Sequence, residues 1–328
     1  MDLLVTGATG LVGNNVVRLA LARGMKVRVL VRAGSDPRPF AGLDVEQITG
    51  DVCDADSVWK ACNGVKLVVH AAAYVQIGWA NLATHQSVNV QGTRNVAEAA
   101  EVVGARMVHV SSVDALGLKH AGEPANEETR PDDGCRVPYV VTKRAAEKEV
   151  LHCAHNGLFA VLVEPAFMLG PWDWKPSSGR MLLAVGSGQG LLAPRGGNDF
   201  CDVREVAAGI LAAGERGISG RRYILGGEHL SYLDAWRMFA RVTGARAPLG
   251  RARPSWILAA GWAGDLWGKV SGREPDVNSA ATFMSTLPHH FSSDRAVAEL
   301  GYKVRPTEEA AQAAWEWFCE NGYAQKRK

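Results

Sequence analysis

Short apolar runs alternate with helical patterns through the first third of the chain, and this alternation limits the fold more than any other feature. Apolar, β-branched runs predict strands at residues 3–6, 27–31, 45–48, 67–70 and 107–110. Between them, apolar residues at helical spacing predict helices at residues 11–23, 54–62 and 88–103. Such units join parallel strands by right-handed crossovers, which place helices on both faces of the sheet. The sequence therefore predicts an α/β fold with a doubly wound parallel sheet.

The strand–helix pattern loosens after about Gly170, where the second half of the chain begins. A short strand is predicted at 223–225, among helices at 232–243, 256–268 and 308–321. The length of 328 residues allows two domains, and neither an internal repeat nor a low-complexity linker separates them. We expect residues 1–170 to form the sheet domain and residues 171–328 to form a smaller mixed α/β annexe. Some annexe segments should return to the sheet.

The charge balance and the cysteine pattern exclude several classes of function. There are 36 basic and 34 acidic residues, so the net charge is only +2, which argues against bulk nucleic-acid binding. None of the six cysteines forms a CxxC pair, so neither a zinc site nor a disulfide framework is expected, and we predict no metal site. The start has no basic region or cleavage site, and the late apolar run from Trp256 to Gly264 is far shorter than the ~20 residues of a membrane span. We therefore expect a cytoplasmic protein.

Three glycines separate the first predicted strand from the first predicted helix. They fall at Gly7, Gly10 and Gly13 in the segment TGATGLVG, where Gly7 would permit a tight turn and Gly13 close packing of helix on strand. Gly10 would let the backbone approach a diphosphate, which the N–H groups at the start of the helix then face. The spacing is GxxGxxG rather than GxGxxG, so it is a variant of the dinucleotide-binding fingerprint.

The end of the second predicted strand bears on which nucleotide binds. An NAD site usually places a carboxylate there for the ribose 2′-hydroxyl, but this strand ends at Arg32 and the nearest carboxylate is Asp36. A guanidinium suits a 2′-phosphate, so we predict NADP(H) in preference to NAD(H). Asp51, after the third strand, could accept a hydrogen bond from the adenine amino group or could simply begin the next helix.

Tyr139 and Lys143 are the strongest candidates for acid–base chemistry. Four residues apart at the start of a predicted helix, they share one face, and a cation there is expected to lower the pKa of the phenol. Ser112 follows the fifth predicted strand, at the sheet edge where ligands of α/β proteins bind, and could bond the substrate oxygen that Tyr139 protonates. For Ser111 we favour a strand-end turn or helix cap.

Seven segments together carry a family resemblance. They are TGATGLVG at 6–13, GDV at 50–52, HAAA at 70–73, NVQGTRNV at 89–96, VSSVDALG at 110–117, YVVTK at 139–143 and EPAFMLGP at 164–171. In order and spacing they resemble the extended short-chain dehydrogenase/reductase family, also described as the NAD-dependent epimerase/dehydratase family. The most similar branch holds dihydroflavonol reductases, 3β-hydroxysteroid and sterol-carboxylate dehydrogenases, and hopanoid-associated sugar epimerases.

The resemblance implies an NADP-binding Rossmann domain over 1–170, a substrate-binding region over 171–328, and a role for each matching residue. The catalytic residues would be Ser112, Tyr139 and Lys143. The cofactor would contact Gly7, Thr9, Gly10, Leu11, Val12, Gly13, Arg32, Asp51, Val52, Ala71, Ala72, Ala73, Tyr139, Lys143, Pro165 and Met168. Two residues depart from the branch: Glu164 stands where Asn is common, and Asp114 stands where a small residue is usual.

The substrate is less constrained, and three alternatives stay open. Trp79, Trp172 and Trp174 could line a pocket for a rigid apolar ring system, which favours an alcohol dehydrogenase or ketone reductase (EC 1.1.1 type) acting on a sterol or triterpenoid. This would be of the 3β-hydroxysteroid or sterol-4-carboxylate 3-dehydrogenase type. A sugar or nucleotide-sugar epimerase or dehydratase is the second alternative, for which Lys175, Arg180, Arg195 and Arg204 could bind a second diphosphate. The third is a non-catalytic, NADP-sensing binding protein.

Residues 255–270 form an apolar segment that we expect to line or gate the substrate entrance. Pro254 could start a helix in which Trp256, Ile257, Ala260 and Ala263 share a face, while glycines lower its intrinsic helicity and favour a mobile lid. The segment could also contact a membrane surface peripherally. We further expect a small-molecule substrate and a homodimer.

Overall fold

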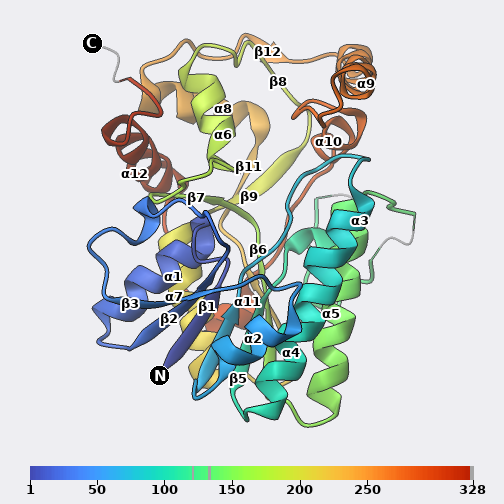
Figure 1. Ribbon diagram of the computed structural model, residues 1–328. Helices are drawn as coiled ribbons and strands as arrows, with labels where there is room; N and C mark the ends of the chain where they lie inside the picture. The colour runs from blue at the N-terminus through green and yellow to red at the C-terminus, as the bar shows by residue number, and fades with distance from the viewer. Residues whose placement is uncertain (120–121, 132–133, 326–328) are drawn as a thin grey trace.

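A seven-stranded parallel sheet forms the centre of the protein in a computed structural model, which describes residues 1–119, 122–131 and 134–325 (Figure 1). The strand order is β10-β6-β5-β4-β1-β2-β3, and every neighbouring pair is parallel. The strands are β1 (Leu3–Thr6), β2 (Val27–Val31), β3 (Val45–Thr49), β4 (Leu67–His70), β5 (Arg106–Val110), β6 (Ala160–Pro165) and β10 (Arg222–Leu225). The predicted doubly wound α/β fold is confirmed.

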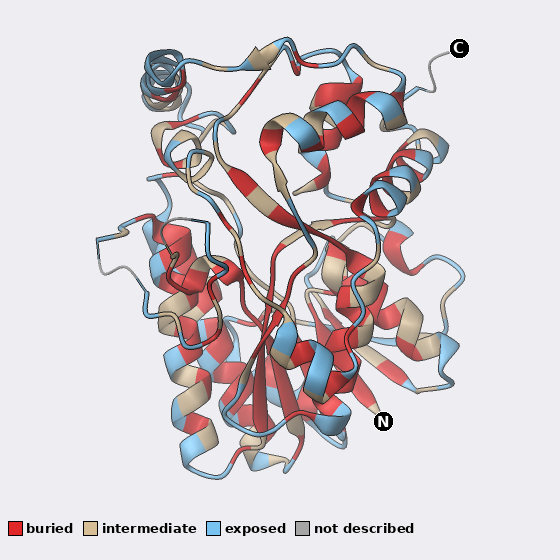
Figure 2. Cartoon of the chain, turned by 180° about the vertical axis from the view of Figure 1, so that it is seen from behind, coloured by how far each residue is buried: buried red, intermediate tan, exposed pale blue. Residues whose placement is uncertain are grey.

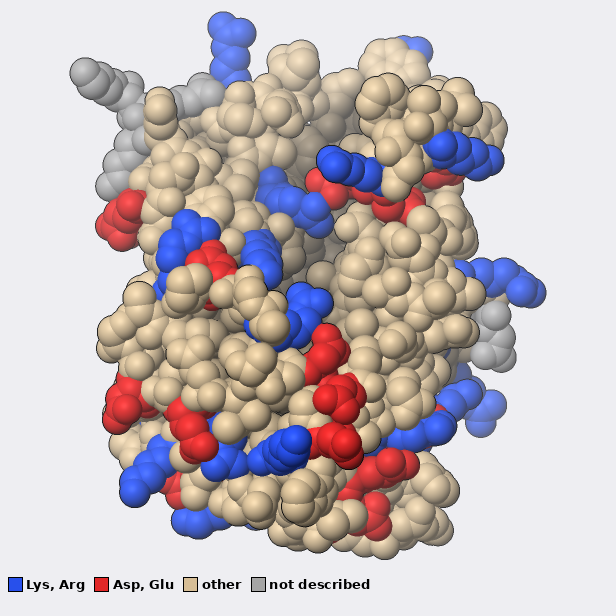
Figure 3. Space-filling view, viewed as in Figure 1, with Lys and Arg blue, Asp and Glu red and all other residues tan. Residues whose placement is uncertain are grey.

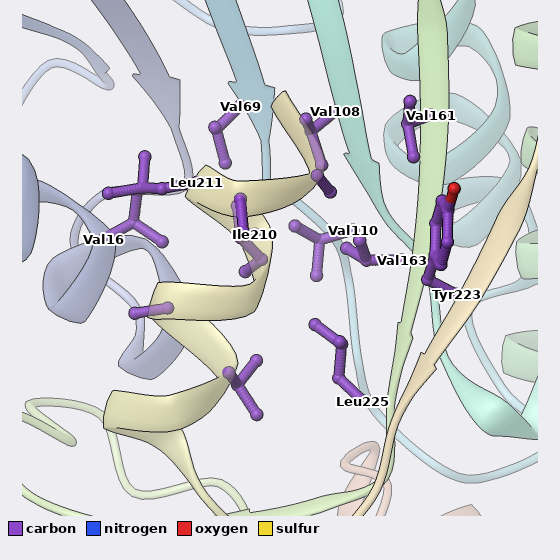
Figure 4. Packing of buried hydrophobic residues seen from close by; sticks show 14 of the residues in the cluster. Val16, Val69, Val108, Val110, Val161, Val163, Ile210, Leu211, Tyr223 and Leu225 are labelled. Atoms are coloured by element: carbon purple, nitrogen blue, oxygen red, sulfur yellow. The ribbon is translucent and has the colours of Figure 1, made fainter. Parts of the chain in front are cut away.

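Helices cover both faces of this sheet because successive strand residues point to opposite sides. In β1, Leu3 and Val5 pack against one face, and Leu4 packs against the other. The first face carries α1 (Leu11–Ala22), α7 (Val203–Arg216) and α11 (Asp294–Leu300), and Figure 4 shows Ile210 and Leu211 of α7 packed against the strands. The second face carries α2 (Ala55–Cys62), α4 (Gly92–Val102) and α5 (Pro138–His155).

A second, smaller layer lies above the carboxyl edge of the sheet (Figure 1). It contains a three-stranded sheet in the order β11-β9-β7 and a two-stranded pair, β12 with β8. Its strands are β7 (Phe167–Leu169), β8 (Leu192–Ala193), β9 (Gly197–Asp202), β11 (Glu228–Ser231) and β12 (Gly250–Arg251); its helices include α6 (Gly179–Gly186), α8 (Tyr232–Thr243) and α12 (Thr307–Glu320). Between the strands of this layer the chain returns to the main sheet through α7 and β10, so the two layers interleave along the sequence.

Short helical elements lie in the connections next to the predicted site residues. α3 (Leu82–His85) continues through a π-helical turn, η2 (Gln86–Gln91), into α4, so the helix that the sequence predicts at 88–103 begins earlier than expected. After β5, a 3-10 turn, η3 (Val113–Ala115), follows the two serines at the strand end. A second 3-10 turn, η1 (Arg38–Phe40), closes the loop after β2.

The predicted 255–270 segment forms α9 (Pro254–Ser271), which packs against α10 (Ser279–Met284). The predicted helix start at Pro254 is confirmed, and the four residues expected to share a face differ in burial: Ile257 is buried, whereas Trp256, Ala260 and Ala263 are exposed. The helix packs instead through Gly261 and Gly264: a Cβ at Gly264 would lie 1.8 Å from the carbonyl oxygen of Val277. These glycines therefore serve close packing of α9, which was not expected from their low helix propensity. Among the described residues, no helix is both long and apolar enough to pass through a bilayer.

Candidate active site

The carboxyl ends of the parallel strands gather most of the predicted site residues along one edge of the sheet, where open α/β sheets bind ligands. β1 leads into the glycine loop, β4 into Ala71, Ala72 and Ala73, and β5 into Ser111 and Ser112. β2 and β3 lead into Arg32 and Asp51, at the far end of the strand order from β5 and β6. The edge is therefore polarised, with the predicted adenosine contacts at one end and the predicted catalytic residues at the other.

The glycine loop has the geometry that its spacing predicts. Gly7 has φ of +69°, and a Cβ there would lie 2.5 Å from the backbone nitrogen of Ala72, so turn and packing both require glycine. A Cβ at Gly13 would lie 2.4 Å from the carbonyl oxygen of Gly7. A Cβ at Gly10 would meet the described protein only at the same oxygen, at an ordinary 3.4 Å. The protein itself thus demands glycine at 7 and 13, and position 10 is open for a ligand.

The start of α1 adds an anion site to this loop. Gly10 is its N-cap residue, no side chain caps it, and its first turn contains no acidic residue. The N–H groups of Leu11, Val12 and Gly13 therefore lack the side-chain cap that a helix start often has. Such an end stabilises a phosphate group, as expected for a dinucleotide cofactor.

The charged residues after β2, where the adenosine ribose of the cofactor is expected, favour a ribose that carries a 2′-phosphate. Arg32 is exposed, whereas the nearby Asp36 carboxylate is engaged by Arg38, whose Nη2 lies 2.6 Å from it and whose backbone N–H also donates to it. These hydrogen bonds from Arg38 lower the pKa of Asp36. The carboxylate that could have turned back toward a ribose hydroxyl is thus held by a different residue.

Asp51 closes the turn after β3 rather than starting the next helix. Its Oδ1 accepts a hydrogen bond from the backbone N–H of Cys53 at 2.9 Å, and the N-cap of α2 is Asp54. Val52 is buried, and its carbonyl oxygen accepts from Asn95 Nδ2 at 2.8 Å. Helix capping therefore does not account for Asp51, and its proposed adenine contact stays a prediction.

Tyr139, Ser112 and Lys143 are all buried at the end of β5. Tyr139 shares a side-chain hydrogen bond with Ser112, and Lys143 Nζ donates to the carbonyl oxygen of Val110 at 2.8 Å. Tyr139 and Lys143 occupy the first turns of α5, one turn apart. The tertiary fold thus brings together the three residues that the sequence predicts as catalytic.

The expected effect of Lys143 on Tyr139 is not what the structure shows. Burial, and after it the charge of Asp114, raises the pKa of Tyr139 above its ordinary value, and the hydrogen bond with Ser112 only partly opposes this. Burial also lowers the pKa of Lys143 to about 8, so that it is still mostly charged at neutral pH and loses its charge above about pH 8. Desolvation outweighs the charge of the neighbouring cation, because both groups are almost completely enclosed.

The two serines after β5 differ in what their hydroxyls bind. Ser112 caps η3 by accepting from the backbone N–H of Asp114 at 3.2 Å, in addition to its contact with Tyr139. Ser111 donates to Glu147 Oε1 at 2.5 Å, away from the cap. The cap that we had assigned to Ser111 therefore belongs to Ser112, whose hydroxyl is held by local backbone geometry.

Glu164, one of the two departures from the branch, belongs to a buried charge network. Arg222 lies between two carboxylates, with Nη2 2.9 Å from Glu147 and Nε 3.2 Å from Glu164. Burial, and after it the charge of Glu147, raises the pKa of Glu164 well above its ordinary value. The network ties β6 to α5 and β10, which supports a structural role for Glu164.

Asp114, the second departure, links the site to the upper layer. It accepts from Ser112 Oγ at 3.2 Å, and its other oxygen lies 3.4 Å from Nε2 of the buried His289. His289 was not predicted from the sequence, since it lies 175 positions away from Asp114, the residue that it contacts. The hydroxyl of Ser112 is thus connected to a residue of the upper layer.

Apolar side chains of α10 pack in the cluster that contains Tyr139. Tyr139, Val137 and Val140 form a cluster with Ala280 of α10, and the partly buried Ile77, Cys135 and Met284 pack against it. The contacts with Ala280 and Met284 were not expected from the sequence, because they join segments more than 100 residues apart. Apolar side chains of α10 thus belong to the cluster that contains Tyr139.

The three predicted pocket tryptophans lie in two places. Trp79 donates from its indole N–H to Ser279 Oγ at 2.7 Å, next to the segment that covers Tyr139. Trp172 and Trp174 pack against Trp317 of α12, at ring distances of 6.0 and 5.0 Å, and Arg18 stacks on Trp172. In Figure 1, α12 lies above the α1 side of the sheet and α10 above the α5 side, so the structure does not bring these two indoles to the catalytic trio.

The remaining predicted cofactor contacts lie along β6 and β7. Pro165 ends β6, and Met168 lies in β7, where its carbonyl oxygen accepts from Ser178 Oγ at 2.5 Å. Figure 3 shows Lys and Arg side chains around the hollow between the sheet layer and the upper layer. Of the four basic residues considered for a second diphosphate, Arg180 pairs with Asp276, and Arg204 pairs with Asp202 at 2.5 Å.

Comparison with known proteins places this geometry among characterised relatives. The model of the NAD dependent epimerase/dehydratase family matches residues 3–226. A provisionally named dihydroflavonol 4-reductase of Synechocystis sp. is 35% identical, covering 97% of this chain and 95% of the relative. Sterol demethylase protein B of Methylococcus capsulatus is 34% identical, covering 98% and 99%. The solved structure of a nucleoside-diphosphate-sugar epimerase from Pseudomonas aeruginosa is 25% identical, covers 99% of each chain and has a TM-score of 0.81.

Proposed function

The chain belongs to the NAD-dependent epimerase/dehydratase family, and on that basis we propose that it is an NADP(H)-dependent oxidoreductase. Its reaction would interconvert a secondary alcohol and a ketone on a bulky, largely apolar ring substrate. The observation that carries the proposal is the assembled trio of Ser112, Tyr139 and Lys143 beneath an apolar cover from α10.

The trio supplies proton transfer to the reacting oxygen. A bound NADP(H) would donate or accept the hydride. In the direction of reduction, the raised pKa of Tyr139 keeps its phenol protonated at neutral pH, so that it can donate a proton to the carbonyl oxygen. Ser112, held by η3, would orient that oxygen, and Lys143 would hold the nicotinamide ribose.

The preference for NADP(H) rests on two arginines and one carboxylate. Arg32 is exposed after β2, where the 2′-phosphate is expected, and Arg38 engages Asp36. A guanidinium can bond a phosphate in a bidentate manner, whereas an NAD site would need a free carboxylate at this point. The charge distribution therefore supports the phosphorylated cofactor.

The apolar substrate class is supported by the cover of Tyr139 and by the relatives. Ala280, Met284 and Ile77 belong to or pack against the apolar cluster that contains Tyr139, and hydrocarbon surface there suits a ring system better than a sugar. One relative that matches nearly the whole chain is a sterol demethylase protein B. We propose a sterol- or triterpenoid-like substrate, of the 3β-hydroxysteroid or sterol-4-carboxylate 3-dehydrogenase type.

A sugar or nucleotide-sugar epimerase or dehydratase is the second candidate. The basic side chains around the central hollow favour it, as does the similar structure of a nucleoside-diphosphate-sugar epimerase. Against it, Arg180 and Arg204 are engaged by carboxylates of this chain. A non-catalytic NADP-binding role is the least supported, since the trio is assembled.

Net turnover of cofactor separates these candidates. The purified protein would be mixed with NADP⁺ and a panel of 3β-hydroxysteroids, and separately with nucleotide sugars, while NADPH absorbance and product composition are followed. We expect NADPH to accumulate with a steroid and not in the Tyr139→Phe variant. Epimerised sugar without NADPH would favour the second candidate, and cofactor binding without any turnover across the panel would favour the third.

A further inference from the structure

α9 presents to solvent the kind of surface that proteins normally bury. Trp262 is 67% exposed, Trp267 64% and Val270 75%, and Trp256, Leu258 and Leu266 are also more than half exposed. In Figure 2 this helix, at the upper left, is coloured mostly as exposed, with smaller buried and intermediate parts. Contiguous apolar surface of this kind usually marks a site where a partner or a membrane binds.

The exposed face is a consequence of how the helix packs. Ile257 and Gly261 are its only fully buried residues, and Gly264 continues the same stripe against Val277 and Asn278. Because the glycines place the α9 backbone directly on the 277–282 segment, the large side chains are left on the outer side. The chain thus holds this face outward in a defined orientation.

The acidic and the basic side chains near α9 differ in whether other groups of the chain engage them. Its acidic neighbours are engaged by other groups of this chain: Asp265 accepts from the backbone N–H of Ser279 at 2.9 Å, and Glu274 accepts from that of Ala80 at 2.8 Å. Asp276 pairs with Arg180. The basic residues at the two ends of the helix form no ion pair with any described residue; they are Arg251, Arg253, Lys269 and Arg273.

From this arrangement we propose that α9 docks on the surface of an anionic lipid bilayer, with its axis in the membrane plane. Its 18 residues would extend about 27 Å along the interface, with the indoles at headgroup depth and the arginines and lysine on lipid phosphates. The binding would be peripheral and reversible, and it would depend on the anionic lipid content.

A second copy of the chain is a poorer occupant of this face. Both ends of α9 carry two cations, so any two-fold pairing of the helix with its copy would bring basic ends together. An anionic bilayer neutralises both ends at once. Charge complementarity therefore favours lipid over self-association.

Docking would also bring the active site close to the lipid. α9 packs on α10, and Ala280 of α10 packs on Tyr139. If the proposed apolar substrate is right, this places the cover of the catalytic site beside the phase in which such a substrate dissolves. The docking itself does not depend on that function, and its test does not use turnover.

Vesicle flotation of the full chain tests the proposal, with vesicles of phosphatidylcholine alone and vesicles that also contain phosphatidylglycerol. We expect the wild type to float with the anionic vesicles and not with the neutral ones. The double variant Trp262→Gln/Trp267→Gln should lower the partition coefficient at least ~10-fold, since interfacial binding scales with the apolar area buried. The matched control is Trp59→Gln, which alters a half-exposed tryptophan on α2 and should bind as the wild type does.

A pair of charge-reversal substitutions tests the electrostatic contribution to vesicle binding. Arg251→Glu/Lys269→Glu should weaken binding to the anionic vesicles by at least ~10-fold, whereas the control Lys60→Glu/Lys148→Glu on α2 and α5 should not. Failure of the wild type to float with anionic vesicles overturns the proposal, as does an equal loss in the tryptophan control. A dimer in sedimentation velocity that the Trp262/Trp267 variant dissociates would instead assign this face to a second copy, which also overturns it.

Discussion

The site edge of the sheet and the outer face of α9 break the usual rule of burial in opposite directions. At the sheet edge, Lys143 and Glu164 are enclosed, and so is His109, although charged and polar side chains are rarely buried completely. On α9, Trp262 and Trp267 stand in solvent, although large apolar side chains normally supply the core. The first region loses solvation of its polar groups, and the second forgoes burial of its apolar groups.

The buried polar groups at the sheet edge and the exposed apolar groups of α9 therefore need different physical explanations. Buried ionisable groups cost stability unless they are partnered, and they are retained where shifted pKa values serve chemistry. His70 is an example of a buried group that has partners. Burial lowers its pKa to about 3, and its two ring nitrogens are hydrogen-bonded to the hydroxyl groups of Thr6 and Thr93. An exposed apolar face has no such internal partner, so its explanation lies outside the described chain.

The largest expected effect is at the catalytic phenol. Tyr139→Phe should lower turnover by about 100-fold or more, in the range of general acid–base contributions, because the ring keeps its packing but the proton is lost. Affinity for NADPH, measured by titration calorimetry, should change little. Tyr323→Phe serves as the control, since its hydroxyl donates to the carbonyl oxygen of Trp174 in the upper layer. Retention of more than about a tenth of turnover would contradict the assigned proton transfer.

Lys143 should show the next largest effect and a distinct pH dependence. Lys143→Met should weaken NADPH binding and lower the rate together, because we assign it both ribose binding and charge. Since burial lowers the pKa of Lys143 to about 8, its positive charge is present below that pH and is lost above it. Wild-type affinity for NADPH should therefore fall between pH 7 and pH 9, and the variant should lack this dependence. A variant with the wild-type pH profile would refute this role.

A substitution in the glycine stripe tests whether the exposed face depends on the packing of α9. Gly264→Ala places a methyl group against the carbonyl oxygen of Val277, so we expect overpacking to destabilise the α9–α10 pair by about 1–3 kcal/mol. Hydrogen exchange of residues 254–284 should become faster while the main sheet stays protected. Gly268→Ala is the control, because its Cβ would meet Pro275 at a more tolerable 3.1 Å. Equal protection in both variants would show that the stripe does not hold the helix.

The smallest effect is expected at the exposed end of the cofactor site. Arg32→Glu should lower affinity for NADPH by about 10-fold, since hydrogen bonds to charged groups contribute about 1.5–3 kcal/mol. NADH affinity should change much less, and titration calorimetry of both cofactors on both proteins gives the comparison. Wild-type protein that binds NADH as tightly as NADPH would remove the argument for Arg32.

Local sequence determined the sheet, the glycine loop and the position of the trio. The spacing of apolar residues along the chain distinguishes strands from helices within a few residues. The four-residue spacing of Tyr139 and Lys143 places both on one face of α5. Gly7 and Gly13 are required by contacts of the loop with its own helix and with the start of the chain after β4. Features of this kind depend on neighbours in sequence or on a register that the fold class already implies.

Only the tertiary structure decided the electrostatics of the trio and the exposure of α9. The pKa of Tyr139 depends on the desolvation that all surrounding elements produce, which outweighs the cation four residues away. Its partners His289, through Asp114, and Ala280 come from the far end of the chain. The spacing of apolar residues in α9 did not predict which of them are buried, because its glycines could pack closely only once residues 277–282 lay against them. Burial is set by packing in three dimensions, and residue spacing along one helix cannot determine it.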